Sequence, residues 1–260
     1  MTQPTLLVAD EASVRTITIN RPDKLNALNR QLIGDLASAF AAAENDAGVR
    51  ALVLTGAGEK AFVAGADVSE MAGLAPIDLR DFSRHGQALM LSIERLSKPV
   101  IAAINGFALG GGFELAMACH LRFASETSMI GQPEVKLGLI PGFGGTQRLL
   151  RLAGRGAALE LCLTGDPVNA LRAHQLGLIT RIVAAADVVS EATAAARKLA
   201  TLAPQALRGV IDAIAFGGES PLDQGLDYET QLFAVLASTQ DMREGTGAFL
   251  EKRKPVFTGR

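Results

Sequence analysis

The chain has no tryptophan, a single tyrosine, two cysteines and three histidines in 260 residues. Cys119 and Cys162 cannot build a disulfide framework, and neither belongs to a C-x-x-C pair. Both lie in apolar helical patterns, where a buried reduced thiol is expected. His85, His120 and His174 have no metal-ligand spacing and no H-E-x-x-H motif occurs, so we expect neither a metal site nor histidine catalysis.

An excess of charge of one sign is also missing. Lysine and arginine number 25 against 27 acidic residues, a net charge of −2, which argues against a basic surface for nucleic acid or anionic membrane. The first residues form no basic-then-apolar signal peptide, and no uncharged stretch reaches membrane-spanning length. We therefore expect a cytoplasmic protein that binds neither nucleic acid nor membrane. Hydrophobic residues make up 48%, enough for a large core.

Strand and helix patterns alternate in the first half of the chain. Alternating β-branched residues over 14–19 and apolar runs over 51–55 and 100–104 predict strands. Helical periodicity covers 30–45, with Asn29 as its N-cap, and 77–96. This order predicts an α/β core with both sheet faces covered.

Beyond residue 143 the pattern becomes mostly helical, with one short strand expected at 178–183. The helices are expected at 144–153, 156–163, 170–176, 187–201, 205–216, 222–238 and 241–252. We divide the chain into a core at 1–195 that carries the active site and a helical C-terminal region at 196–260.

Three consecutive glycines, Gly110 to Gly112, stand between the strand at 100–104 and a helix that carries Glu114. Free N–H groups and the helix dipole at such a point favour negative charge on a ligand. The G-x-G-x-x-G spacing of a Rossmann loop is absent here, and the glycines at 56–58 lack the Gly-Lys-Ser/Thr ending of a P-loop. A tight turn without a ligand remains an alternative.

A second source of backbone donors is the segment 62–68, which follows the strand at 51–55. Its small residues at 64–66 permit close approach by a carbonyl, and Asp67 is a candidate helix cap. Together with the triple glycine, this segment supplies the two N–H groups that an oxyanion hole needs.

Glu114 and Glu134 are the candidate acid–base pair. Each alone is more often a structural residue, a dipole partner or a turn residue. Both lie beside glycine-rich backbone in apolar surroundings, where partial burial raises a carboxyl pKa into a range useful for proton transfer. No G-x-S-x-G elbow occurs, which argues against a serine hydrolase.

These segments together resemble the enoyl-CoA hydratase/isomerase, or crotonase, family over nearly the whole chain. The most specific matches are Arg21–Leu28, Ala64–Asp67, Asn105–Glu114, Gly131–Glu134 and Pro141–Arg148. The resemblance implies a spiral of ββα units followed by a helical C-terminal region, assembled as a trimer or a dimer of trimers.

The resemblance also implies an activity and its residues. The thioester carbonyl of an acyl-CoA would lie between the N–H groups of Ala66 and Gly111. Glu114 would activate water and Glu134 would supply the proton to C2, so that water adds reversibly and syn across a 2,3 double bond. Such a hydro-lyase acts in fatty-acid metabolism, as in β-oxidation. It needs no cofactor, because coenzyme A is part of its substrate.

Further positions match the family's contacts with substrate and coenzyme A. They are Lys24, Leu25, Ala27, Ala64, Asp67, Val68, Gly142, Phe249 and Lys252. Gly142 corresponds to a glycine that supports the loop of the second acid, and Phe249 and Lys252 to positions that reach a neighbouring subunit's site. His120 departs from the aspartate that many members have there.

Two alternatives stay open. Within the family, the chain could be an enoyl-CoA isomerase or another crotonase-type lyase. Outside it, the fold could serve as an RNA-binding or scaffold protein, which the near-neutral charge and the intact acid pair argue against. Residues 68–96 and the C-terminal helices are expected to set the acyl-chain length.

Overall fold

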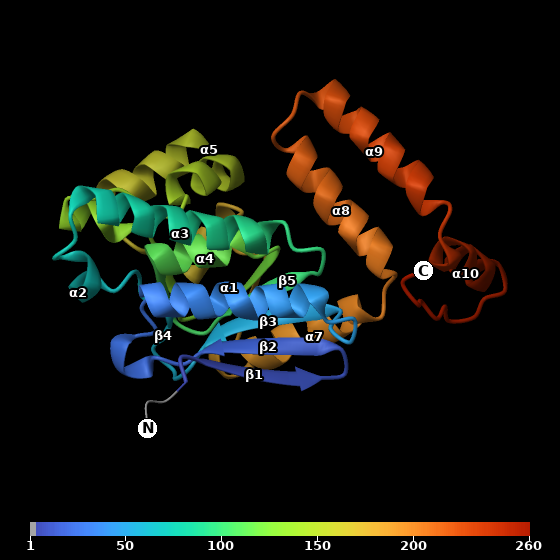
Figure 1. Ribbon diagram of the computed structural model, residues 1–260, viewed down its shortest axis with the longest axis horizontal. Helices are drawn as coiled ribbons and strands as arrows, with labels where there is room; N and C mark the ends of the chain where they lie inside the picture. The colour runs from blue at the N-terminus through green and yellow to red at the C-terminus, as the bar shows by residue number, and fades with distance from the viewer. Residues whose placement is uncertain (1–3) are drawn as a thin grey trace.

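A strand–strand–helix order repeats three times in residues 4–260, which the computed structural model describes (Figure 1). The three units are β3 (Ala51–Gly56), β4 (Ala61–Val63) and α3 (Pro76–Glu94); β5 (Val100–Ile104), β6 (Phe107–Leu109) and α4 (Gly111–Ala118); and β7 (Leu121–Ser125), β8 (Met129–Gly131) and α5 (Gly145–Thr164). The predicted ββα units are therefore present. Residues 1–3, which belong to the segment in which no signal peptide was predicted, lie outside the described residues.

The two strands of each unit belong to two different sheets. The first strands join a six-stranded sheet of order β1-β2-β3-β5-β7-β10, and the second strands join a four-stranded sheet of order β4-β6-β8-β9. The remaining strands are β1 (Leu6–Glu11), β2 (Val14–Ile19), β9 (Val168–Asn169) and β10 (Arg181–Val183). Successive units pair in parallel in both sheets, so the chain advances as a spiral.

Both faces of the larger sheet are buried at its central strands, and the alternation of side chains along each strand explains this. Leu52 and Leu54 of β3 belong to the main core, whereas Val53 points to a second cluster on the other face. Helix α7 (Val188–Ala200) covers that second face through small residues, among them Ala192 and Ala196. The continuous apolar runs seen in the sequence are thus central strands covered on both sides.

Local signals explain where two helices begin and break. Asn29 caps α1 (Arg30–Asn45) as predicted, because its side chain accepts the Leu32 N–H at 2.9 Å. The two helices expected at 144–153 and 156–163 form one element, α5, with a break at Gly154. That residue has φ 77° and ψ 170°, a conformation that favours glycine.

The C-terminal helices leave the core after α7. They are α8 (Pro204–Gly217), α9 (Leu222–Leu236) and α10 (Gln240–Leu250). Helix α6 (Ala170–Gln175) lies earlier in the chain, between β9 and β10. Figure 1 shows the α8–α9 hairpin and α10 (orange and red) to one side of the sheets. The boundary that we placed between 195 and 196 falls inside α7, whose buried alanines continue to Ala200. The region that leaves the core therefore begins after Ala200.

The strand expected at 178–183 is shorter than predicted, since β10 begins at Arg181. The Leu178 carbonyl accepts the Arg122 Nε–H instead of a ladder N–H, and pairing with β7 begins at Phe123. No single helix of residues 4–260 is long and apolar enough to cross a membrane. Residues 185–200 and 204–217 meet that test only when counted together across a 109° bend.

Gly112 provides a test of how closely α4 packs on β4. A Cβ at this position would lie 2.0 Å from the Val63 carbonyl oxygen, a backbone atom that cannot turn away. Gly112→Ala should lower the free energy of unfolding by about 3 kcal/mol or more, measured by urea denaturation. Gly156→Ala is the control, since its Cβ would meet nothing within 4 Å. Equal stability of the two variants would contradict this packing.

Candidate active site

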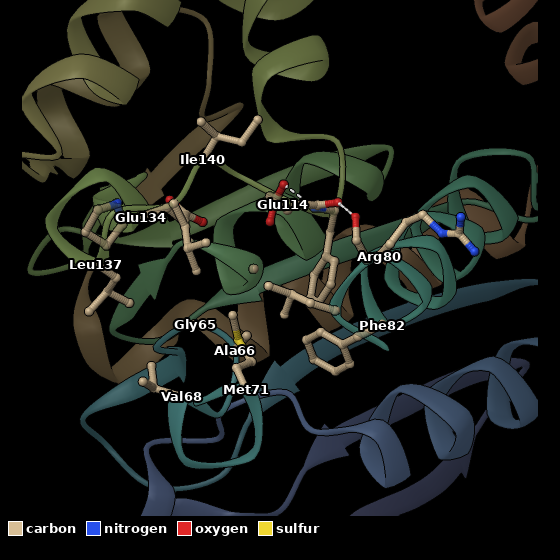
Figure 2. A pocket seen from close by; sticks show the side chains of 18 of the residues that line it. Gly65, Ala66, Val68, Met71, Arg80, Phe82, Glu114, Glu134, Leu137 and Ile140 are labelled. Atoms are coloured by element: carbon tan, nitrogen blue, oxygen red, sulfur yellow. Dashed lines mark hydrogen bonds between the residues drawn. The ribbon is translucent and has the colours of Figure 1, made fainter. Parts of the chain in front are cut away.

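A cavity of about 400 Å³ lies between α2 (Val68–Met71), α3, α4 and the 3-10 helix η2 (Pro133–Leu137). It brings together seven of the residues singled out in the sequence: Ala64, Ala66, Val68, Gly111, Glu114, Glu134 and Gly142. Figure 2 shows Glu114 and Glu134 beside each other, with Gly65 and Ala66 below them in this view. Apart from the two acids and Arg80, the lining is mainly apolar.

The backbone at the cavity wall offers two N–H groups. Gly110 has φ 51° and ψ −128°, a turn that suits glycine, and it leads from β6 into the first turn of α4. A Cβ built on Gly111 would lie 3.5 Å from the Ala66 nitrogen, so the two segments are adjacent. Within residues 4–260, neither the Ala66 nor the Gly111 N–H is donated to a protein acceptor. Both are available to a ligand oxygen.

Glu114 projects from the first turn of α4 and is 1% exposed. Its Oε1 accepts the backbone N–H of Phe143 at 2.8 Å and that of Gly145 at 2.6 Å. These two bonds fix the carboxylate, and no protein group among the described residues donates to its second oxygen. That second oxygen is the one available to hold water or a proton.

Glu134 lies in the first turn of η2 and approaches the turn at Gly110. A Cβ on Gly110 would lie 2.8 Å from Glu134 Oε1, so only glycine leaves room for the acid at this distance. Gln132 is fully buried beside it. With its amide nitrogen toward the acid, Gln132 donates to both carboxylate oxygens of Glu134 at 3.0 and 3.1 Å. The Gln132 amide therefore contacts Glu134 on one side, and the turn at Gly110, which has no side chain, lies on the other.

Burial raises the pKa of both carboxyl groups. The pKa of Glu114 rises to about 7, first through burial and then through the charge of Glu134. The N–H donors and Arg148 oppose this rise in part. The pKa of Glu134 also rises to about 7 through burial. The two groups titrate as a coupled pair, and one shared proton near neutral pH gives one acid and one base.

Several expected contacts lie outside this cavity. Leu25 lines a separate hollow of about 290 Å³ with Asn26 and Lys60, whereas Lys24 and Ala27 line neither space. Asp67 stands at the N-cap of α2, but the expected capping bond is absent. Its carboxylate instead accepts from Arg21 Nη2 at 3.0 Å and from Ser69 Oγ.

Phe249 and Lys252 lie at the end of α10 and beyond it, which Figure 1 places far from α2. Phe249 is 82% exposed. In a single chain these two residues do not reach the cavity, so their contact with a neighbouring subunit's ligand stays a prediction.

The role expected for Gly142 requires a correction. The segment at 141–145 supports Glu114 rather than Glu134, because its N–H groups at Phe143 and Gly145 are donated to Glu114. The Gly142 carbonyl in turn accepts from α3. The sequence signal was the run of glycines around Phe143, but which acid it serves depends on the path of the chain through space.

No histidine or cysteine of the described residues lines this cavity. His120 accepts the Val100 N–H at Nδ1, and burial lowers its pKa. Burial raises the pKa of Cys119 to about 12 and that of Cys162 to about 11, which keeps both thiols protonated. Within residues 4–260, no three His, Cys, Asp or Glu side chains gather as a metal site would require.

Comparisons with known proteins agree with this geometry. The family model described as enoyl-CoA hydratase/isomerase matches residues 9–260. The chain is 44% identical to the short-chain-enoyl-CoA hydratase of Clostridium acetobutylicum, over 96% of this chain and 95% of that protein. It is 41% identical to the crotonyl-CoA hydratase of Syntrophomonas wolfei, over 99% of both.

Solved structures are equally similar. A crystal structure of enoyl-CoA hydratase from Bacillus anthracis superposes with a TM-score of 0.96 at 40% identity, covering 99% of this chain and 100% of that one. A second, from Geobacillus kaustophilus, gives 0.94 at 42% identity and covers 99% of each chain.

The raised pKa of Glu114 predicts a pH-dependent cost to stability. As pH rises from about 4.5 to about 7, the unfolded chain releases this proton before the folded chain does, so folding stability falls. Glu114→Gln removes that ionisation. The free energy of unfolding of the variant is compared with that of the wild type by urea denaturation at fixed protein concentration. We expect this difference to shift in favour of the variant by up to about 3 kcal/mol between pH 5 and pH 8. The same difference at both pH values would contradict an ionisable, buried Glu114.

Proposed function

Because the chain belongs to the enoyl-CoA hydratase/isomerase family, we propose that it hydrates the 2,3 double bond of a 2-enoyl-CoA thioester. The chain is then a hydro-lyase. The observation that carries the proposal is the pairing of a buried acid, Glu114, and a half-buried one, Glu134, with two free backbone N–H groups in one apolar cavity. Relatives named as hydratases over almost their full length support it.

The chemistry follows from what each group can do. The N–H groups of Ala66 and Gly111 would hold the thioester oxygen and stabilise the enolate charge that develops there. This polarisation makes C3 electrophilic. Ionised Glu114, fixed through Oε1, would take a proton from water as it attacks C3, and protonated Glu134 would deliver its proton to C2. Dehydration reverses both transfers.

Hydration and isomerisation differ in the number of acid–base groups that they require. An isomerase moves a double bond with one acid–base group, whereas hydration needs two groups, one for water and one for C2. Both acids are present here, which favours the hydratase. Product analysis with a 2-enoyl and a 3-enoyl thioester distinguishes the two reactions.

We further propose a short acyl chain. The two relatives named above are a short-chain-enoyl-CoA hydratase and a crotonyl-CoA hydratase. The apolar wall beyond the acids includes Phe82 and Phe143, which are almost fully buried. Such rigid rings leave limited room for a long tail. A product of this kind, a 3-hydroxyacyl thioester, suits a following oxidation as in β-oxidation, and the reaction needs no cofactor of its own.

Replacing Glu134 tests the acid pair. Glu134→Gln keeps the shape but removes the exchangeable proton, so kcat for crotonyl-CoA hydration should fall by about 100-fold or more in an absorbance assay. Binding of the saturated butyryl-CoA, measured by calorimetry, should persist because the N–H donors are untouched. Glu126→Gln, at an exposed turn after β7, is the matched control. Near-normal turnover of folded Glu134→Gln would refute the two-carboxylate mechanism.

The C-terminal helices support a proposed trimer or dimer of trimers. Large apolar side chains stand exposed on α8, α9 and α10, among them Ile214 at 70%, Phe233 at 79% and Leu250 at 79%. Large exposed apolar side chains on three successive helices support an interface there. In such an assembly Phe249 and Lys252 would come within reach of a neighbouring subunit's coenzyme A.

Light scattering tests this assembly. We expect the wild type to have the mass of three or six chains at micromolar concentration. Phe233→Glu places a charge on the exposed face of α9 and should shift the mass toward smaller species. A monomeric wild type would contradict the proposal.

A further inference from the structure

Helix α3 holds the segment that supplies the donors of Glu114. Ser83 Oγ donates to the Gly142 carbonyl at 2.5 Å, and Gln87 Nε2 donates to the same oxygen at 3.0 Å. Two side chains one turn apart therefore fix the peptide just before Phe143.

The ring of Phe143 fits against α3 only because residue 86 is glycine. A Cβ on Gly86 would lie 2.2 Å from Cδ1 and 2.4 Å from Cε1 of that ring. On the ring's other edge, a Cβ on Gly111 would lie 3.1 Å from Cδ2. Phe82 packs against it edge-on, with ring centroids 5.3 Å apart. The ring is 3% exposed and confined by all three neighbours.

The place of the ring decides where the peptide points. The Phe143 N–H is donated to Glu114 Oε1 at 2.8 Å, while the Phe143 carbonyl accepts from Arg148 Nη1 at 3.1 Å. Arg148 is held in turn by Glu94, the last residue of α3, at 2.8 Å. A shift of the ring therefore moves the peptide whose N–H fixes the catalytic carboxylate.

We propose that Gly86 is a positioning residue, whose missing side chain seats the Phe143 ring and so aims the Phe143 and Gly145 N–H groups at one oxygen of Glu114. The inference rests on the proposed function, in which Glu114 activates water. The ring also borders Gly111, but none of these hydrogen bonds includes the N–H groups of Ala66 and Gly111 that would hold the thioester. The larger expected defect therefore lies in turnover and the smaller in binding.

The pH dependence should report this positioning. The ionisable groups whose charge acts on Glu114 or responds to it are Glu134, Arg148 and Cys162. None of them changes identity in the variants below. The N–H bonds of Phe143 and Gly145 lower the Glu114 pKa, so weakening them should move the ionisation of Glu114 to higher pH.

The test is Gly86→Ala in the full-length protein. For crotonyl-CoA hydration, kcat should fall by about 10- to 100-fold, with a smaller change in KM. The acidic limb of the kcat/KM profile, which reports ionised Glu114, should move up by about one pH unit. Gly34→Ala on α1 is the matched control, because its Cβ would meet nothing within 4 Å.

A second variant separates positioning from general damage. Gly86→Ala combined with Phe143→Leu keeps the N–H groups but replaces the rigid ring by a shorter side chain, which lacks Cε1 and can rotate away from the new methyl. It should recover most of the lost rate and return the acidic limb toward the wild-type pH. If Gly86→Ala does not fold, Ser83→Ala weakens the same tether and should move the limb in the same direction by less.

The outcomes distinguish this inference from the proposed function. A wild type that does not hydrate crotonyl-CoA refutes the function. In that case the pKa of Glu114 is measured from the pH dependence of the free energy of unfolding, in the wild type and in Gly86→Ala. Glu114→Gln, introduced into each of these two proteins, is the reference. An unmoved ionisation in folded Gly86→Ala, or no recovery in the double variant, overturns the positioning role of Gly86.

Discussion

The site depends on one contact, in which Glu114 Oε1 accepts the N–H groups of Phe143 and Gly145. A carboxylate buried in an apolar core is costly unless it is hydrogen-bonded, and these two donors come from a loop rather than from its own helix. They fix which oxygen is bound and which faces the cavity. Burial and, after it, the neighbouring charge of Glu134 act in the opposite sense and raise the Glu114 pKa, so the pair shares a proton near neutral pH.

The fold provides this contact through close packing between its repeating units. Glycines stand where two units meet: Gly112 against Val63, and Gly110 against the Glu134 carboxylate. To admit a methyl group, the Val63 backbone would have to shift at Gly112, and the Glu134 carboxylate at Gly110. The spiral therefore does more than stack strands in two sheets. It brings the ends of β4, β6 and β8, and the helices that follow them, to one cavity.

Much of this could be predicted from the sequence. Periodicity located β2, β3, β5 and most helices, but not β7 or the strands of the smaller sheet. The motifs identified both acids and the two backbone segments that line the cavity. What could not be predicted depends on contacts across the chain. The strand at 178–183 is short because Arg122 takes the Leu178 carbonyl. Gly142 serves the first acid and not the second, and α3 supports that acid through Gly86, a role that no motif marks.

The most direct measurement is the pH dependence of kcat/KM for hydration of crotonyl-CoA by the wild-type protein between pH 5 and 9. Two carboxyl groups that share one proton, each with a pKa raised to about 7, predict a bell with its maximum near neutral pH. The acidic limb arises as the base becomes protonated and the basic limb as the shared proton is lost. A rate that stays flat across this range would contradict the shared-proton account.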